Sequence, residues 1–230
     1  MIALTVALGT CVATSMLSVM FNVGDKVNQE LKSYGANIVV RPQGAAVLDD
    51  LYNTGEAAEA HSYLREDELG NIKTIFWTYN ILDFTPLLNV SATDASGEHV
   101  PTTGTWFSHH LELATGESVE TGLDRLRGWW GLEGAWPADD DADGAVVGTA
   151  YAAAHGLAVG DSFTLTREGI TRDFTVRGII TSGDDADRGV FIQLAQAQAL
   201  IGREGAVGSV EVSALTTPDN DLARKAAKNP

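Results

Sequence analysis

Carboxylates at alternate positions make one stretch of the chain resemble the start of a calcium loop. "DDDADG" places Asp139, Asp141 and Asp143 two residues apart and follows them with a glycine. A calcium loop of this kind closes with a bidentate Glu at its twelfth position, and that position is Ala150 here. We therefore predict a solvated acidic loop, with calcium binding as the alternative, and assign no metal ligand.

A second stretch, "SHHLE", carries His109, His110 and Glu112. Adjacent residues of a strand point to opposite faces, so the two histidines do not easily share one ion. His110 and Glu112 would lie on one face, which leaves a transition-metal site as an alternative. The other three histidines are far apart in the sequence: His61, His99 and His155.

The motifs of common enzyme classes are absent from the sequence. No G-x-S-x-G occurs, so the strained serine turn of α/β-hydrolases is missing. No G-x-x-x-x-G-K-[ST] occurs either, so no loop cradles the phosphates of ATP. The single cysteine, Cys11, lies in an apolar run and cannot serve a soluble Cys–His pair. We predict a protein that is not an enzyme, without catalytic or cofactor-binding residues.

Two further stretches have side chains suited to contacts with a partner. "GDDADRG", with the acids from Asp184 to Asp187, lies between two expected strands; a solvated turn is the first interpretation and a contact loop the alternative. "RGWWGLEGAW" holds Trp129, Trp130 and Trp136. These rings would form either an exposed apolar patch or part of a core, and the sequence leaves both open.

Composition excludes some partners. The chain has 230 residues and a formal net charge of −16, from 31 acidic and 15 basic residues. That balance argues against nucleic acid, which needs concentrated Lys and Arg, and against a polybasic contact with anionic lipid. The length is enough for one large domain or two small ones.

The first 24 residues contain no charged side chain. A helix of this length would rise about 36 Å and cross a hydrocarbon core of about 30 Å. We predict a transmembrane helix over residues 1–24, surrounded by lipid, with a signal or anchor segment and a buried core helix as alternatives. Helical spacing continues to Tyr34, Gly35 fits the end of that helix, and "NIVVRP" follows as a strand. A helix joined directly to a sheet, without a flexible linker, would transmit movement well.

Local patterns predict the later elements. We expect a short helix from about Thr149 to His155 stopped by Gly156, and a helix in "AQAQALIG" closed by Gly202. "SFTLT" and "ITRDFTVRGIITSG" are expected to form a hairpin with "REG" in its turn. "NILDFTPLLNVSAT" should be a strand that Pro86 interrupts, and "YLREDELGNIKTI" a helical stretch.

In this order, these pieces resemble the MacB/FtsX-type permeases of ABC transporters. The segments that carry the resemblance are "GDKVNQELKSYGANIVVRP", "VVGTAYAAAHGLAVGDSFTLT" and "TVRGIITSGDDADRGVFIQLAQAQALIG". The resemblance implies an α+β fold, with the transmembrane helix followed by a two-lobed extracytoplasmic core domain over residues 25–230. A porter-like α/β lobe would comprise about 35–97 and 189–230, and an inserted, mostly-β lobe about 98–188. Family members have three more spans after this domain, so the resemblance implies that the chain is C-terminally truncated.

The same resemblance implies the partners and the location. We expect a permease subunit in the bacterial inner membrane, with its main domain periplasmic and ATP hydrolysed on a separate ABC ATPase subunit. A permease homodimer or paralogous heterodimer and an extracytoplasmic binding protein are further expected partners, and nucleic acid is not. "IKTIFWTYNILDFTPLL" and "SVEVSALTTP" look closest to the permeases encoded with iron-uptake systems. The alternatives are an FtsX-like signalling or scaffold protein that activates an external hydrolase, and an anchored binding domain without an ABC partner.

Overall fold

The computed structural model describes residues 35–42 and 63–215. Within these two ranges, no helix is long and apolar enough to cross a membrane. The predicted transmembrane helix over 1–24, its continuation to residue 34, Cys11 and His61 all lie outside the described residues.

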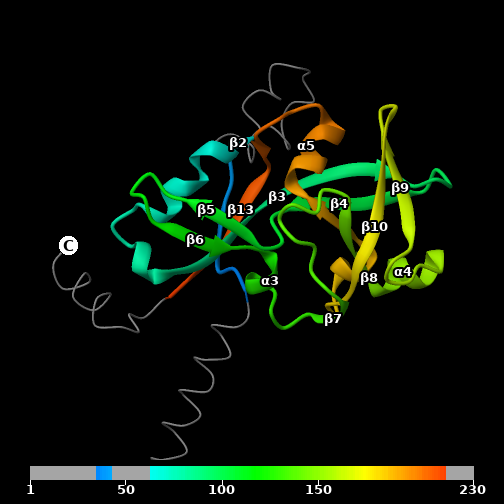
Figure 1. Cartoon of the computed structure of the whole chain (residues 1–230), viewed down its shortest axis with the longest axis horizontal. Helices are drawn as coiled ribbons and strands as arrows, with labels where there is room; N and C mark the ends of the chain where they lie inside the picture. Colours follow the sequence, from blue (N-terminus) through cyan, green and yellow to red (C-terminus); the bar gives the residue numbers. More distant parts are fainter. Residues whose placement is uncertain (1–34, 43–62, 216–230) are drawn as a thin grey trace, which may run out of the picture.

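Most of the strands form one mixed nine-stranded sheet (Figure 1). Its order is β1 (Ile38–Val40), β13 (Ser209–Ala214), β3 (Ile81–Thr93), β4 (His99–Thr105), β11 (Val190–Gln193), β8 (Gly144–Gly148), β10 (Ile170–Thr181) and β7 (Gly131–Gly134). The ninth strand, β9 (Ser162–Arg167), pairs with both β10 and β3. Only the β4–β11 and β8–β10 pairs are parallel within the described sheet.

Six of these strands form a closed ring. β3, β4, β11, β8, β10 and β9 pair in that order, and β9 returns to β3 through Thr93 and Thr166. The hydroxyl of Thr93 donates to the carbonyl oxygen of Thr166 over 3.1 Å. Helix α5 (Leu194–Ile201) contacts five of the six strands. The fit is close, because a Cβ added at Gly104 of β4 would lie 2.2 Å from the Cβ of Ala197.

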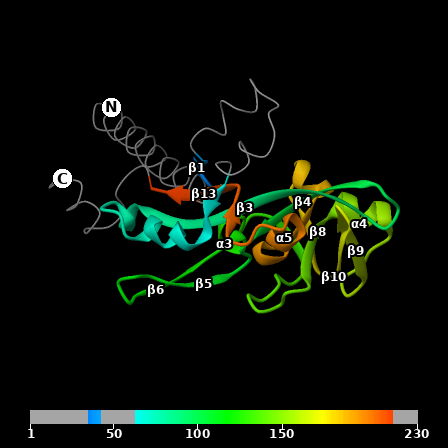
Figure 2. The same ribbon diagram turned by 90° about the horizontal axis from the view of Figure 1, so that it is seen from above.

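The remaining elements lie around this sheet. They are the pair β2 (Leu64–Arg65) and β12 (Ala206–Val207), the hairpin β5 (His109–Glu112) and β6 (Ser118–Thr121), the short helices α3 (Leu123–Leu126) and α4 (Thr149–His155), and the 3₁₀ helices η2 (Glu66–Lys73), η3 (Thr78–Asn80) and η4 (Asp185–Arg188). Figure 2 shows β3 running along the length of the molecule, from the edge that holds β1 and β13 to the end that holds α4.

Two hydrophobic clusters meet at β8. All five residues of this strand are buried, as expected for a strand covered on both faces. Ala145 and Val147 belong to the larger cluster, which is built with α5 and β3. Val146 points the other way, into a smaller cluster that includes Phe107 and Trp130. Because alternate side chains of β8 point to opposite faces, this one strand contributes to both clusters.

Several local predictions are confirmed. Helix α4 spans Thr149–His155 and ends at Gly156, and α5 ends at Gly202, both glycines having a φ of 65°. The β9–β10 hairpin turns at Glu168 and Gly169, which both have positive φ. The expected helical stretch after Tyr63 is present as the 3₁₀ helix η2.

The predicted interruption at Pro86 is wrong, because β3 continues through this residue. The amide of Phe84 points toward the β4 side of the strand, where it donates to the hydroxyl of Thr121. Residue 86, two positions on, faces the same side, but the β4 ladder begins only at the next residue, Leu87, opposite Thr105. The proline therefore lacks an N–H where no neighbouring strand needs one.

The two expected lobes share this sheet. Strand β11, from the proposed porter-like segment 189–230, lies between β4 and β8 of the proposed inserted segment 98–188. Strand β3 runs from β13 to the ring. The lobe boundaries stay a prediction.

Candidate functional site

The side chain of Asn37 adds to the backbone ladder that joins the first and last strands of the described domain. The amide nitrogen Nδ2 of Asn37 donates to the carbonyl oxygen of Ala214 over 2.6 Å, and the Ala214 amide donates to Oδ1 of Asn37 over 2.9 Å. The backbone amide of Asn37 donates to Val212 over 3.1 Å. We call this arrangement the Asn37 clasp. It holds the start of β1 beside the end of β13.

Asparagine suits this position for a chemical reason. Its side-chain amide carries both a donor and an acceptor in one plane, so it can bond the C=O and the N–H of a single residue. Asn37 thereby extends the β1–β13 ladder, in which Ile38 lies opposite Val212. The first and last described residues, Gly35 and Leu215, consequently lie at one edge of the sheet.

Gly35 packs tightly where the chain approaches β1. Its φ is +85°, a conformation that side chains rarely adopt. A Cβ there would lie 2.4 Å from the ring of Trp129 and 2.5 Å from the guanidinium of Arg127. The glycine is thus required twice, by its backbone conformation and by the space that the Trp129 ring occupies. Gly35, which we expected at the end of the first helix, is thus packed against the domain.

Arg127 connects the loop after α3 to β13. Its guanidinium forms an ion pair with Glu211, with side chains 20% and 17% exposed. The same guanidinium lies 5.3 Å from the ring centroid of Trp129 and 5.7 Å from that of Trp130, within range of a cation–π contact. Glu211 lies opposite Val39 of β1, so the ion pair reaches the clasped edge.

Behind this contact, a buried carboxylate fixes α3 to the sheet. Oδ1 of Asp83 accepts from the hydroxyl of Thr121 over 2.6 Å, and Oδ2 accepts from Nε of Arg125 over 2.7 Å. Asp83 is on β3, Thr121 on β6 and Arg125 on α3. Because a buried carboxylate needs such partners, the three elements are held in a fixed arrangement.

The three predicted tryptophans do not form one patch. Trp130 is buried in the smaller core cluster, and Trp136 packs against that cluster with its ring 6.0 Å from Phe107. Trp129 is 39% exposed and lies against Gly35. Core packing therefore accounts for two of the rings, and the contact with Gly35 accounts for the third.

The carboxylates of the calcium-like stretch have separate partners. Asp139 accepts from Nδ1 of His109 over 2.8 Å, while Asp141 pairs with Arg177 of β10 over 2.7 Å. The His109 ring also stacks on Trp106 at 4.1 Å. The structure thus directs these two acids to different elements. His110 and Glu112 both lie on the exposed face of β5, as their spacing predicted.

The acids of "GDDADRG" turn back on their own loop. Asp187 accepts from the backbone amides of Ser182 and Gly183 over 2.6 and 3.1 Å. The amide of Ser182 is the main cause that holds the pKa of the Asp187 carboxyl below its usual range. The loop presses on β8, since a Cβ at Gly148 would lie 2.2 Å from the Asp187 carbonyl. This is an ordered turn in which Asp185 remains exposed.

Two of the histidines that are far apart in sequence, His99 and His155, lie within the described residues and have different hydrogen-bond partners. His99 lies beside Ser91, with its Nε2 2.6 Å from the hydroxyl. His155, on α4, places Nε2 2.9 Å from Oδ2 of Asp94. Sequence reasoning missed the contact between Asp94 and His155. The only local signal was a turn, "TDASGEH", with an acid at each end.

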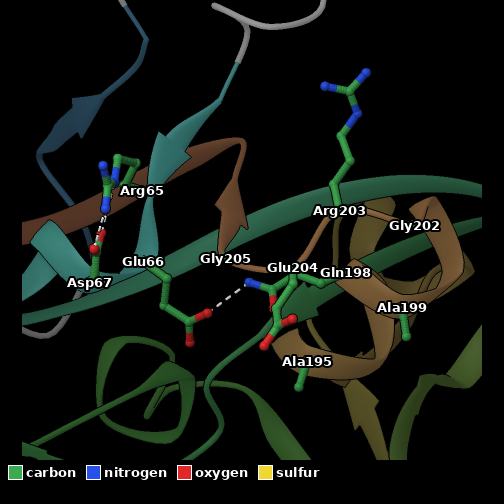
Figure 3. A pocket seen from close by; sticks show the side chains of 10 residues that line it. All are labelled: Arg65, Glu66, Asp67, Ala195, Gln198, Ala199, Gly202, Arg203, Glu204 and Gly205. Carbon is green, nitrogen blue, oxygen red and sulfur yellow. Dashed lines mark hydrogen bonds and ion pairs between the residues drawn. The ribbon is translucent and has the colours of Figure 1, made fainter.

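A groove of about 1040 Å³ lies between the start of η2 and the end of α5 (Figure 3). Glu66 crosses its base, accepting from Nε2 of Gln198 over 2.8 Å and from Nε1 of Trp106 over 3.3 Å. Arg65 and Asp67 pair with each other at its rim. The lining carries both signs of charge, and nothing in it selects one chemical class of ligand.

The fold and the clasp together define a class: an α+β domain whose first and last strands are hydrogen-bonded neighbours. The family of MacB-like periplasmic core domains matches residues 1–229, and the chain belongs to this family. The resemblance to MacB/FtsX-type permeases is thus confirmed, and the domain is of the extracytoplasmic type found in this class of ABC-transporter permeases.

Two solved structures are similar to this chain, and the first of them supports the fold. The periplasmic region of MacB from Actinobacillus actinomycetemcomitans matches with a TM-score of 0.51 at 15% identity, over 85% of this chain and 82% of that one. The extracellular domain of the noncanonic ABC-type transporter YknZ from Gram-positive bacteria aligns with a TM-score of 0.48 at 11% identity, over 82% and 88% of the two chains. None of the curated proteins compared with the chain matches it.

Proposed function

We propose that the chain is part of a permease subunit of an ABC transporter, and that its extracytoplasmic domain couples ATP-driven movement of membrane helices to the handling of a substrate or partner. In this proposal residues 1–24 cross the bacterial inner membrane within lipid, and residues 25–230 form a two-lobed periplasmic domain. ATP is hydrolysed by a separate subunit. The domain itself carries out no catalysis.

The Asn37 clasp is the observation that supports coupling. A displacement of the segment before Gly35 would act on β1 and, through the clasp, on β13. Strand β13 pairs with β3 over most of its length. Since β3 has 13 residues, it extends about 43 Å at about 3.3 Å per residue and continues into the six-stranded ring. Movement at one end of the domain would thus reach the other along a stiff element.

The proposed assembly follows from the family. The permease pairs with a second copy or a paralogue, binds an ABC ATPase, and works with an extracytoplasmic binding protein. The sequence resemblance to permeases encoded with iron-uptake systems suggests a cargo related to iron uptake. An FtsX-like role, in which the same movement activates a cell-wall hydrolase, is the competing outcome of the test below.

Hydrogen–deuterium exchange of the complete permease with its ATPase subunit tests coupling. We expect ATP to change the exchange of amides in β1, β13 and β3. In Asn37→Ala the change in β13 and β3 should fall by at least half, because the clasp is lost. Asn89→Ala is the matched control, since Asn89 is exposed and among the described residues its side chain accepts a hydrogen bond from Thr103 over 3.1 Å.

Two results would count against the proposal. If ATP leaves the exchange of all three strands unchanged in an assembled complex, the domain is not coupled to the ATPase. If a cell-wall hydrolase co-purifies and becomes active with ATP while no cargo moves, the FtsX-like role is correct.

A further inference from the structure

Three side chains that could bind a cation converge at the end of the domain opposite the clasp. Asp94 directly follows β3, Glu98 directly precedes β4, and His155 is the last residue of α4. One ligand atom from each lies within 4.8 Å of the other two. Figure 2 shows the β3–β4 turn beside α4. The fold thus brings together residues that are 61 positions apart.

The turn orients the Asp94 carboxylate so that one oxygen accepts hydrogen bonds within the turn and the other faces His155. Oδ1 accepts from the Ser96 amide, the Ser96 hydroxyl and the Glu98 amide, at 2.8, 2.6 and 2.9 Å. The side chain is only 7% exposed. Oδ2 has one described partner, Nε2 of His155 at 2.9 Å. The carboxylate is therefore oriented before any ligand arrives.

A hydrogen bond outside the cluster determines which ring nitrogen of His155 carries a hydrogen. Its Nδ1 lies 3.0 Å from the carbonyl oxygen of Tyr151. A carbonyl oxygen only accepts, so Nδ1 must carry the hydrogen, and in a neutral ring Nε2 then has a lone pair. That lone pair faces Oδ2 of Asp94, which is also an acceptor. Two acceptors that face each other at 2.9 Å need either a proton between them or a metal cation that lies beside them and binds both.

The backbone contact of His155 also fits a metal ligand. Histidines that bind metals commonly donate their second N–H to a backbone carbonyl, which fixes the ring and its tautomer. The Tyr151 ring, centred 4.2 Å from the His155 ring, limits its rotation as well. Both contacts hold Nε2 toward the carboxylates, while Glu98 is exposed and free to change rotamer.

We propose that Asp94, Glu98 and His155 bind a divalent transition-metal ion of the zinc class. One imidazole nitrogen and two carboxylate oxygens suit Zn²⁺ and its neighbours, whereas Ca²⁺ takes six to eight oxygens. Metal–ligand distances of about 2.0–2.2 Å in a tetrahedral site separate the ligands by about 3.4 Å. To reach that size the Asp94–His155 pair, now at 2.9 Å, would open slightly, and Glu98 would move toward both. Three protein ligands leave a fourth position for water or for a group on a partner.

The test titrates the metal-free chain with ZnCl₂ by calorimetry and with Co²⁺ by visible absorption. We expect one ion per chain and d–d bands of low-symmetry Co²⁺. His155→Gln and Glu98→Gln should each weaken binding by about 10-fold to 100-fold. His110→Gln is the matched control, because this exposed histidine also has an acid, Glu112, on its face, and its variant should bind like the wild type.

Circular dichroism of each variant shows whether it is folded, which is checked because Glu98 is exposed but the His155 side chain is only 25% exposed. The proposal is overturned if the folded wild type binds no Zn²⁺ at 100 times the concentration of chain. It is also overturned if all three variants bind as the wild type does. Either result would leave the contact between His155 and Asp94 as a hydrogen bond with no role in metal binding.

Discussion

Gly35 shows how a single residue can control the edge from which movement would enter the domain. Its positive φ and its contact with Trp129 are two different constraints, and substitutions can measure the energetic cost of each. In Gly35→Ala the left-handed backbone costs about 1–2 kcal/mol, and displacement of the Trp129 ring costs about 1–3 kcal/mol more. We therefore expect a loss of about 2–5 kcal/mol in the free energy of unfolding, measured by urea denaturation.

Gly116→Ala is the control for this experiment. Gly116 has almost the same φ, +82°, but a Cβ there would meet nothing within 4 Å. Its loss should be limited to the backbone cost. Equal losses in the two variants would show that the Trp129 contact has no energetic weight. The double variant Gly35→Ala/Trp129→Ala should recover part of the loss if the clash is its cause.

At the scale of an element, the turn around η4 is stabilised by an ionised carboxylate. The folded pKa of Asp187 is lowered, chiefly by the Ser182 amide, below the ordinary value of about 3.9. A lowered pKa stabilises the fold above the unfolded value, and that stabilisation disappears as pH falls through the folded value. Asp187→Asn should thus melt below the wild type by a constant amount from pH 5 to 7, and the gap should narrow below about pH 4.

Melting temperatures between pH 2.5 and 7 check this expectation. Asp185→Asn is the matched control, because its side chain is fully exposed and pairs with the exposed loop residue Arg188. Its curve should follow the wild type throughout. A gap for Asp187→Asn that does not change with pH would mean that the charge of Asp187 has no part in holding the turn.

The elements also show what the sequence could predict. Helices α4 and α5 and the β9–β10 hairpin follow from nearby residues, since Gly156, Gly202 and Gly169 supply the conformations at their ends. Pro86 was misjudged because its effect depends on where β4 ends, which is information from another strand.

The sites were less predictable for the same reason. Asn37 and Ala214 are 177 positions apart, and Asp94 and His155 are 61 apart. No local pattern marks either pair, because only the complete sheet brings its members together. Conversely, the calcium-like spacing of Asp139 and Asp141 was visible in the sequence, but the fold supplies His109 and Arg177 as their partners.

At the scale of the whole molecule, the shared sheet predicts cooperative unfolding. Strand β3 pairs with β13 at one end and with β4 along the other, and β8 joins both hydrophobic clusters. Neither proposed lobe can lose its strands without exposing the core of the other. We expect one calorimetric transition whose van't Hoff and calorimetric enthalpies agree.

Tryptophan fluorescence and far-UV circular dichroism should give the same midpoint as calorimetry. Trp130 reports on the smaller cluster and Trp106 on the larger. Two separated transitions, with the fluorescence following one and the dichroism the other, would show that the lobes unfold independently despite the continuous sheet.

The Asn37 clasp also bears on how such a domain can be inserted into other proteins. The two ends of the domain are adjacent, so its insertion would separate the flanking residues of a host chain by about as much as a hairpin does. Domains with neighbouring termini tolerate insertion and circular permutation. A short linker between Gly35 and Leu215 would close the chain, and new termini could then open at the exposed turn around Gly169. The same geometry predicts that the domain can be inserted between two neighbouring elements of another protein with little displacement of either.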